Sequence, residues 1–262
     1  MSTTALQIEP SSDQVIRVEN LTASFDDQVI LRDISLHVNR GEILVIAGGS
    51  GCGKSTLLKH MIGLYRPEAG QVLIDGENIS AADSQAMFHI LRKIGVMYQH
   101  GALFGSMTVL ENVRLPLEEF TDLPVNAMDI IALTKLQMVD LEHAAHRLPS
   151  ELSGGMQKRA AIARAMALDP HIIFLDEPSA GLDPITSAGL DELIMRLSRL
   201  LKMTFVVVSH ELASIFTIAD RVAVLDGESK TIVGLDRPQQ LRDDNNDPRI
   251  QAFFRRKTKI ET

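Results

Sequence analysis

The chain has 262 residues, of which 45% are hydrophobic and 23% are charged, and its formal net charge is −8. This composition predicts a folded globular protein that buries a sizeable core, either as one large domain or as one domain with an insertion. The acidic balance argues against a nucleic-acid footprint across the surface, so we expect no nucleic-acid partner. Cys52 is the single cysteine, which excludes internal disulfides and cysteine-based zinc clusters and is typical of a reducing cytosol.

The sequence predicts neither a membrane-spanning helix nor an N-terminal targeting segment. No stretch approaches the roughly 18 uninterrupted apolar residues of a spanning helix, and residues 1–13 are polar rather than basic and then apolar. We therefore expect the chain to stay on the side of the membrane where it is made, with residues 1–13 as a flexible N-terminus. Residues 255–259 include a basic run that is either a solvated tail or a contact with an interface or a membrane surface.

Short alternating segments at residues 15–18 and 34–38 predict strands, and residues 71–76 predict another after a Pro-Glu-Ala-Gly turn. No long helix separates the first strands, so we expect a small antiparallel layer beside a parallel core. Phe25 lies in this region. Its ring could stack on an adenine or pack in the core, and the sequence alone favours the core.

The most specific motif is a phosphate-binding loop at residues 48–56, which fits G-x-x-x-x-G-K-[ST] between an apolar strand at 43–47 and a helix. The glycines let backbone N–H groups face phosphates, Lys54 can reach the β- and γ-phosphates, and Ser55 can offer a hydroxyl to Mg²⁺. Cys52 lies at the helix start near Lys54, so we expect thiolate character and an alkylation that blocks ATPase activity unless ATP protects it. The candidate nucleotide ligands here are Gly48, Gly49, Ser50, Gly51, Cys52, Gly53, Lys54, Ser55 and Thr56.

Apolar residues recur at helical spacing from about residue 86 to residue 167. Within this stretch, residues 94–98 are strand-like and lead into Gln-His-Gly-Ala-Leu-Phe at 99–104. The simplest organisation is a helical insertion, over about 86–167, into a nucleotide-binding domain that extends over 14–242. Residues 243–262 then form a C-terminal tail, whose apolar residues could mediate subunit contact or pack on their own domain.

A second anion site is predicted where Leu-Ser-Gly-Gly-Met-Gln-Lys-Arg, from residue 152, leads into an alanine-rich helix. Ser153 is a natural N-cap, and Gly154 and Gly155 leave the first backbone N–H groups of the helix unobstructed. An ordinary capped helix is the alternative interpretation. Two phosphate-binding helix N-termini in one chain are unusual.

An apolar strand ends in the adjacent carboxylates Asp176 and Glu177. Neighbouring strand residues point to opposite sides, so the two carboxylates cannot do the same job at the same place. One can support Mg²⁺ while the other orients and polarises the attacking water, and the motif order assigns these roles to Asp176 and Glu177 respectively. A later strand delivers His210 to the carboxyl edge of the parallel sheet, where it could contact the γ-phosphate.

Together these motifs resemble the nucleotide-binding subunit of an ABC transporter across about residues 14–235. The resemblance implies an α/β P-loop NTPase core with a parallel sheet, an N-terminal antiparallel β subdomain and an inserted helical subdomain. It implies a head-to-tail homodimer that binds ATP and Mg²⁺, in which Ser153, Gly154 and Gly155 serve the partner's ATP. It also assigns adenine stacking to Phe25 and assigns Gln99 to sensing Mg²⁺ and the membrane subunit. Met156 replaces the commonest Gln of the signature, and Phe25 replaces the usual Tyr.

A narrower resemblance lies in residues 99–104, 152–156 and 183–187, which are similar to the ATPases of Mce-associated, Mla-like systems. These systems move phospholipid or other hydrophobic molecules between the membranes of a bacterial envelope. The resemblance implies integral-membrane permease subunits, an Mce-domain lipid-binding subunit and a peripheral position on the cytoplasmic face of the inner membrane. An ABC transporter for a different substrate and a soluble non-transport ABC ATPase stay open as alternatives.

Overall fold

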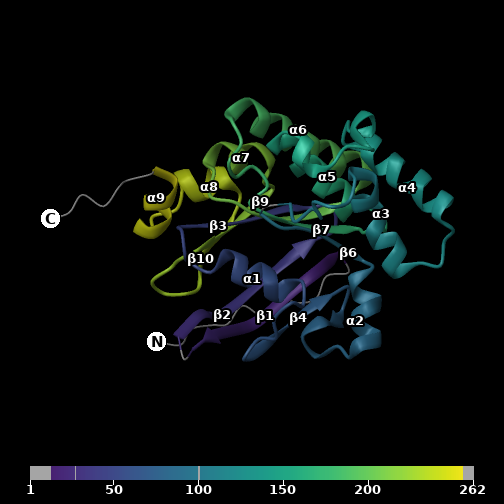
Figure 1. Ribbon diagram of the computed structural model, residues 1–262. Helices are drawn as coiled ribbons and strands as arrows, with labels where there is room; N and C mark the ends of the chain where they lie inside the picture. The colour runs from purple at the N-terminus through teal and green to yellow at the C-terminus, as the bar shows by residue number, and fades with distance from the viewer. Residues whose placement is uncertain (1–12, 27, 100, 256–262) are drawn as a thin grey trace.

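The computed structural model describes residues 13–26, 28–99 and 101–255, and Figure 1 shows two sheets with helices packed between and above them. The predicted flexible N-terminus lies almost wholly outside the described residues. His100 and the basic residues 256–259 also lie outside them. In the part of the chain that is described, no helix is both long and apolar enough to span a bilayer.

The smaller sheet has the order β2-β1-β4-β5 and is antiparallel throughout. Its strands are β1 (Gln14–Phe25), β2 (Gln28–Asn39), β4 (Ala69–Ile74) and β5 (Glu77–Asn78). Alternate residues of β1, among them Ile16 and Val18, are buried, because one face of the sheet packs on the core. The predicted antiparallel layer is therefore confirmed, with longer strands than the short apolar runs indicated.

The larger sheet has the order β10-β9-β3-β8-β7-β6, and only its β9–β10 pair is antiparallel among the pairs that are described. Its strands are β3 (Ile43–Gly48), β6 (Ile94–Met97), β7 (Ile172–Asp176), β8 (Thr204–Val208), β9 (Arg221–Leu225) and β10 (Ile232–Asp236). Every residue of β3, β7 and β8 is buried, as expected for parallel strands covered on both faces. The carboxyl ends of these strands meet at one edge, which is where the candidate site forms.

Nine α-helices are described. They are α1 (Lys54–Met61), α2 (Ser84–Leu91), α3 (Val109–Phe120), α4 (Val125–Met138), α5 (Gly154–Ala165), α6 (Pro184–Leu201), α7 (Leu212–Ile218), α8 (Pro238–Asp243) and α9 (Pro248–Arg255). Short 3₁₀ turns occur at Ile79–Ala81, Glu142–Ala144 and Pro149–Glu151. Helix α1 lies between the two sheets, whereas α5, α6 and α7 cover the opposite face of the larger sheet (Figure 1).

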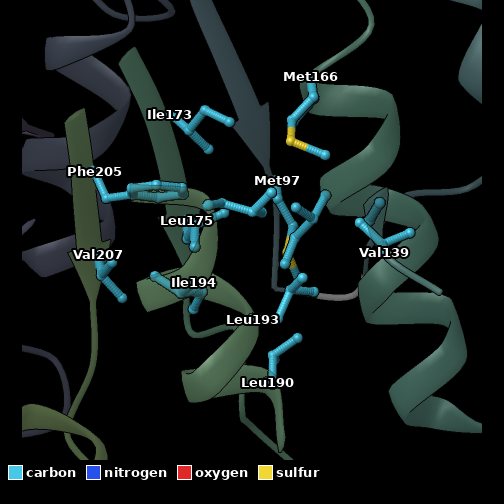
Figure 2. Close-up of a cluster of buried hydrophobic side chains, with 14 of the residues drawn as sticks. Met97, Val139, Met166, Ile173, Leu175, Leu190, Leu193, Ile194, Phe205 and Val207 are labelled. Atoms are coloured by element: carbon cyan, nitrogen blue, oxygen red, sulfur yellow. The ribbon is translucent and has the colours of Figure 1, made fainter. Parts of the chain in front are cut away.

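The two faces of the larger sheet belong to separate apolar clusters, because successive strand residues point to opposite sides. Phe205 and Val207 of β8 join Ile194 of α6 in the cluster beneath α3–α7, part of which Figure 2 shows. Val206 and Val208 of the same strand pack instead with α1 and the antiparallel sheet. Strand β8, which leads to His210, is thus held by apolar packing on both faces of the sheet.

The predicted helical stretch 86–167 contains one strand of the larger sheet, since β6 pairs in parallel with β7. The helices α3, α4 and α5 follow that strand. The start of α3 is defined by a reciprocal capping box between Thr108 and Glu111. Asn112 is fully buried there and bonds the backbone N–H and C=O groups of Phe104, which fixes the loop after β6.

The predicted tail begins inside the folded unit. Ile250 and Phe254 of α9 are buried in the main apolar cluster, and the Phe254 ring centroid lies 5.7 Å from that of Phe216 on α7. Ile250 and Phe254 of this segment therefore pack on their own domain, and contact of the segment with another subunit stays a prediction. Helix α9 also reaches the candidate site described below.

Candidate nucleotide site

The loop between β3 and α1 has the backbone conformation that its glycines permit. Gly51 and Gly53 have φ values of +74° and +103°, in the left-handed region that favours glycine. A Cβ on Gly48 would lie 2.4 Å from the Leu225 carbonyl oxygen. The backbones of these two residues therefore lie too close together for a side chain at position 48. Gly53 has no side chain to cap α1, and the first N–H groups of the helix therefore face an anion site.

The Lys54 ammonium is held within this loop. Its Nζ atom donates hydrogen bonds to the carbonyl oxygens of Gly48 and Gly49, at 3.1 and 2.8 Å, and the residue is buried. The positive charge is thereby positioned at the concave side of the loop instead of being free in solvent. A phosphate cradled by the loop would meet both the ammonium and the backbone N–H groups.

Ser55 and Asp176 meet across the sheet edge. The Ser55 hydroxyl donates to Asp176 Oδ1 at 3.0 Å, which brings the start of α1 to the end of β7. Burial raises the pKa of the Asp176 carboxyl, and the Ser55 hydrogen bond partly offsets this. A hydroxyl and a carboxylate oxygen form a donor set that suits Mg²⁺, which usually takes few protein ligands and completes its shell with water and phosphate oxygens.

Glu177 leaves the strand direction immediately after β7. It has φ +46°, in the left-handed region, and its backbone N–H donates to the Val208 carbonyl at 3.0 Å. Its Oε1 lies 3.0 Å from His210 Nδ1, and its Oε2 accepts from Gln99 Nε2 at 3.1 Å. The side chains of Asp176 and Glu177 contact different partners, as expected. Their different directions arise from this left-handed turn as well as from the alternation of side chains along a strand.

A cavity of about 780 Å³ joins these elements. Its lining includes residues of the phosphate loop together with Phe25, Gln99, Glu177 and His210. Four further lining residues were not singled out from the sequence and are apolar: Ile30, Leu212, Ala252 and Phe253. No motif marks the last two, since they reach the cavity only because α9 folds back onto the domain.

Phe25 lines this cavity instead of the core that the sequence alone favoured. It is 44% exposed, and its ring meets Tyr65 edge-on with centroids 5.4 Å apart. Phe25 is the last residue of β1, where the chain turns toward β2, so its ring extends beyond the buried face of the sheet. The exposed ring has the position needed for stacking on a planar base.

The expectation of a reactive Cys52 is wrong. The residue is only 2% exposed, and burial raises the pKa of its thiol, outweighing the favourable charge of Lys54. Its side chain packs against Gly48 and Gly227. Its neighbours Gly51 and Gly53 line the cavity, whereas Cys52 itself points into the protein and is absent from the lining described here.

The second predicted anion site lies apart from the phosphate loop. Ser153 caps α5 by accepting from the Met156 N–H at 3.3 Å, and Ser153 and Gly154 are exposed. Among the described residues, neither they nor Gly155 line the phosphate-loop cavity. Gly155 is buried, and a Cβ there would lie 2.4 Å from Thr186 Cγ2, so its glycine is required for the approach of α5 to α6.

The fold and these motifs define an ATP-binding cassette of the ABC transporter class. Residues 31–180, more than half of the chain, match the model of the ABC transporter family. The chain therefore belongs to the ABC transporter ATP-binding family, whose members are ATP-hydrolysing subunits.

Relatives at about 40% identity extend over nearly the whole chain. The intermembrane phospholipid transport system ATP-binding protein MlaF of Haemophilus influenzae is 41% identical over 241 residues, covering 92% of this chain and 90% of that protein. MlaF of Escherichia coli K12 is 41% identical over 247 residues, covering 94% and 91%. The "Probable ribonucleotide transport ATP-binding protein mkl" of Mycobacterium leprae is 39% identical over 239 residues, covering 91% of this chain and 68% of its own length.

Solved structures share the fold. CbiO1 of Clostridium perfringens, part of an ABC transporter complex, matches with a TM-score of 0.79 and 27% identity, covering 87% of this chain and 90% of that one. The ATP-binding cassette MJ0796, in a dimeric post-hydrolysis state bound to ADP and Pi, matches with a TM-score of 0.77 and 31% identity, covering 85% and 98%.

Proposed function

We propose that this chain is the ATP-hydrolysing subunit of a transporter that moves phospholipid or another hydrophobic molecule between the membranes of a bacterial envelope. The observation that carries the proposal is the 41% identity to two MlaF proteins, which extends over at least 92% of this chain. The subunit works as a homodimer at the cytoplasmic face of the inner membrane, bound to permease subunits. An Mce-domain subunit that binds lipid completes the complex.

The proposed ATP site uses the contacts described above. The phosphate loop and Lys54 bind the phosphates, and Phe25 stacks on the adenine. Ser55, Asp176 and Gln99 would hold Mg²⁺, which would supply charge neutralisation when bound. Hydrolysis of a terminal phosphate needs positioning and charge stabilisation more than covalent chemistry, and these residues supply both.

Glu177 is the group that orients and polarises the attacking water. Its two carboxylate oxygens are held by Gln99 on one side and His210 on the other, so its direction is set before the water arrives. Gln99 lies two residues beyond the end of β6, at the start of the segment that we assign to contact with the permease. The same side chain therefore touches Glu177 and begins the path to the membrane subunits.

The dimer completes each site in this proposal. Ser153 and Gly154 are exposed and lie outside the phosphate-loop cavity of their own chain, so the α5 N-terminus is free to meet ATP bound by a partner. The dimeric state of the MJ0796 cassette is consistent with this arrangement. ATP binding closes the dimer, and hydrolysis lets it open.

A second candidate function has its own support. The Mycobacterium leprae relative matches almost as much of the chain, and its name assigns transport of ribonucleotides. An ABC transporter subunit for a different substrate would use the same ATP site, because the transported molecule does not contact this subunit. The partners, and not the ATP site, separate the two candidates.

The test is to solubilise membranes that contain the tagged chain and to identify the co-purifying proteins and lipids by mass spectrometry. A permease together with an Mce-domain subunit that carries phospholipid is the expected result. A Lys54→Ala chain should assemble with the same partners while losing ATP-supported transport, which separates assembly from energy use. A permease of another type, or no membrane partner, would contradict the phospholipid proposal.

A further inference from the structure

Helix α5 carries a buried lysine one turn beyond its anion-binding end. Lys158 is only 8% exposed, although lysine is rarely buried without partners. Its Nζ atom donates a hydrogen bond to the Gln99 carbonyl oxygen and lies 3.5 Å from the Glu177 carbonyl oxygen. One ammonium thus contacts the backbone of both residues whose side chains face the proposed attacking water.

These contacts form a closed arrangement. The side chains of Gln99 and Glu177 are hydrogen-bonded to each other, and Lys158 donates to the backbone carbonyl oxygens of both residues. Burial lowers the pKa of Lys158, and the nearby Glu177 and Asp176 carboxylates act in the other direction. Removing the ammonium would take this donor away from the Gln99 and Glu177 carbonyl oxygens, and it would thereby loosen the positions of both residues.

Arg164, near the other end of α5, supports the same segment. Its two guanidinium nitrogens donate to the carbonyl oxygens of Gly101 and Ala102, each at 2.7 Å. The side-chain hydrogen bonds described for Arg164 go to the segment after Gln99, whereas those of Lys158 go to Gln99 and Glu177. A movement of α5 along or about its axis would therefore be transmitted to Glu177 through Lys158.

We infer that Lys158 is a positioning residue that links the two ATP sites of the dimer. The inference rests on the proposed head-to-tail dimer, in which the N-terminus of α5 meets the ATP held by the partner. ATP seated against Ser153 and Gly154 fixes α5, and Lys158 then fixes Gln99 and Glu177 of the same chain around that chain's own ATP. Occupation of one site thereby favours hydrolysis at the other.

The test measures ATP hydrolysis against ATP concentration in the full transporter complex, for the unaltered protein and for Lys158→Met. The unaltered dimer should show a Hill coefficient above 1, with an upper limit of about 2 for two sites. Lys158→Met should bring the Hill coefficient close to 1 and lower kcat about tenfold, since small displacements of a catalytic group are costly. The Kd for ATP should change little, because Lys158 does not line the phosphate-loop cavity as described.

Three further variants make the result specific. Lys158→Arg keeps a cationic donor and should restore part of both the Hill coefficient and kcat. Lys158→Leu also removes the N–H donor and is measured in place of Lys158→Met if that variant fails to fold. Lys202→Met removes an exposed ammonium at the end of α6 and should behave as the unaltered protein.

An unchanged Hill coefficient in the folded Lys158→Met or Lys158→Leu variant would overturn the inference, even if kcat fell, because local damage lowers the rate without uncoupling the sites. A Hill coefficient of 1 in the unaltered dimer would also overturn it. Absence of dimer or membrane partners in the unaltered protein would instead count against the proposed function.

Discussion

The Nδ1 atom of His210 lies 3.0 Å from Oε1 of Glu177, so a residue two positions beyond the end of β8 contacts the residue that follows β7. The contact arises because parallel neighbouring strands end at the same edge of the sheet. Glu177 is further fixed by its left-handed turn and by the hydrogen bond from Gln99. The carboxylate, which follows β7, is thus oriented by side chains that lie beyond the ends of two other strands, β6 and β8.

Replacing Glu177 by Gln should separate ATP binding from hydrolysis. The amide keeps the shape and an acceptor for Gln99, but it cannot polarise water as a carboxylate does. We expect hydrolysis to fall by about 10²-fold or more, while ATP is retained and a closed dimer accumulates. Phosphate release and ATP-dependent dimerisation, followed by light scattering, measure the two effects.

Glu192→Gln is the matched control. It makes the same chemical change at a residue that is exposed on α6 and lies away from the site. Rapid turnover by Glu177→Gln without ATP-dependent dimerisation would contradict the proposed role of Glu177.

Cys52 should resist alkylation in the native protein. The thiolate is the reactive form, and burial both raises the thiol pKa and blocks access. At neutral pH, labelling by a maleimide should be much slower than in the urea-unfolded chain, and ATPase activity should persist. The rate should increase as the pH rises, because the thiolate fraction grows. Mass spectrometry of timed samples measures this, and equal labelling rates in native and unfolded protein would refute it.

Gly155→Ala should destabilise the protein through a clash between α5 and α6. The added methyl would lie 2.4 Å from Thr186 Cγ2, a contact that either the Thr186 side chain or one of the helices must relieve by shifting. We expect a loss of about 1–3 kcal/mol in the free energy of unfolding, measured with urea.

The double variant Gly155→Ala with Thr186→Ser should recover much of this loss. Serine lacks Cγ2 but keeps the hydroxyl that donates to Asp183 Oδ2 at 2.5 Å. Gly154→Ala is the control, because its Cβ would lie 3.5 Å from Leu182 Cδ2, an ordinary contact. If Thr186→Ser gave no recovery, the clash with Thr186 would not be the cause.

Asp176→Asn should lose Mg²⁺-dependent hydrolysis while becoming more stable at neutral pH. Burial raises the carboxyl pKa in the folded protein, so ionisation of Asp176 costs stability as the pH rises through its unfolded value, about 3.9. That cost is complete above the folded pKa and is removed by the amide. Thermal unfolding at pH 7 should therefore shift upward, and the shift should shrink toward pH 4. A lower midpoint at pH 7 would contradict this sign.

The sequence by itself determined the parts of the site that are contiguous in the chain. The phosphate loop, the Ser153 cap and the strand that ends in Asp176 depend on local backbone conformation, turn chemistry and apolar runs, which neighbouring residues control. The antiparallel layer and the parallel core were predictable for the same reason. The predicted segments at 15–18 and 34–38 were, however, several residues shorter than strands β1 and β2, because pairing between the strands extends them beyond the apolar runs.

Only the tertiary structure decided what depends on packing between distant segments. It placed Phe25 in the cavity and Cys52 inside the protein, although both lie beside motifs that the sequence identified. It showed that Gly155 is small because Thr186 lies against it, and that Lys158 reaches Gln99 and Glu177. Contacts between elements that are distant in the sequence determine how deeply a side chain is buried, and burial in turn shifts its pKa and reactivity. No local sequence pattern encodes those contacts.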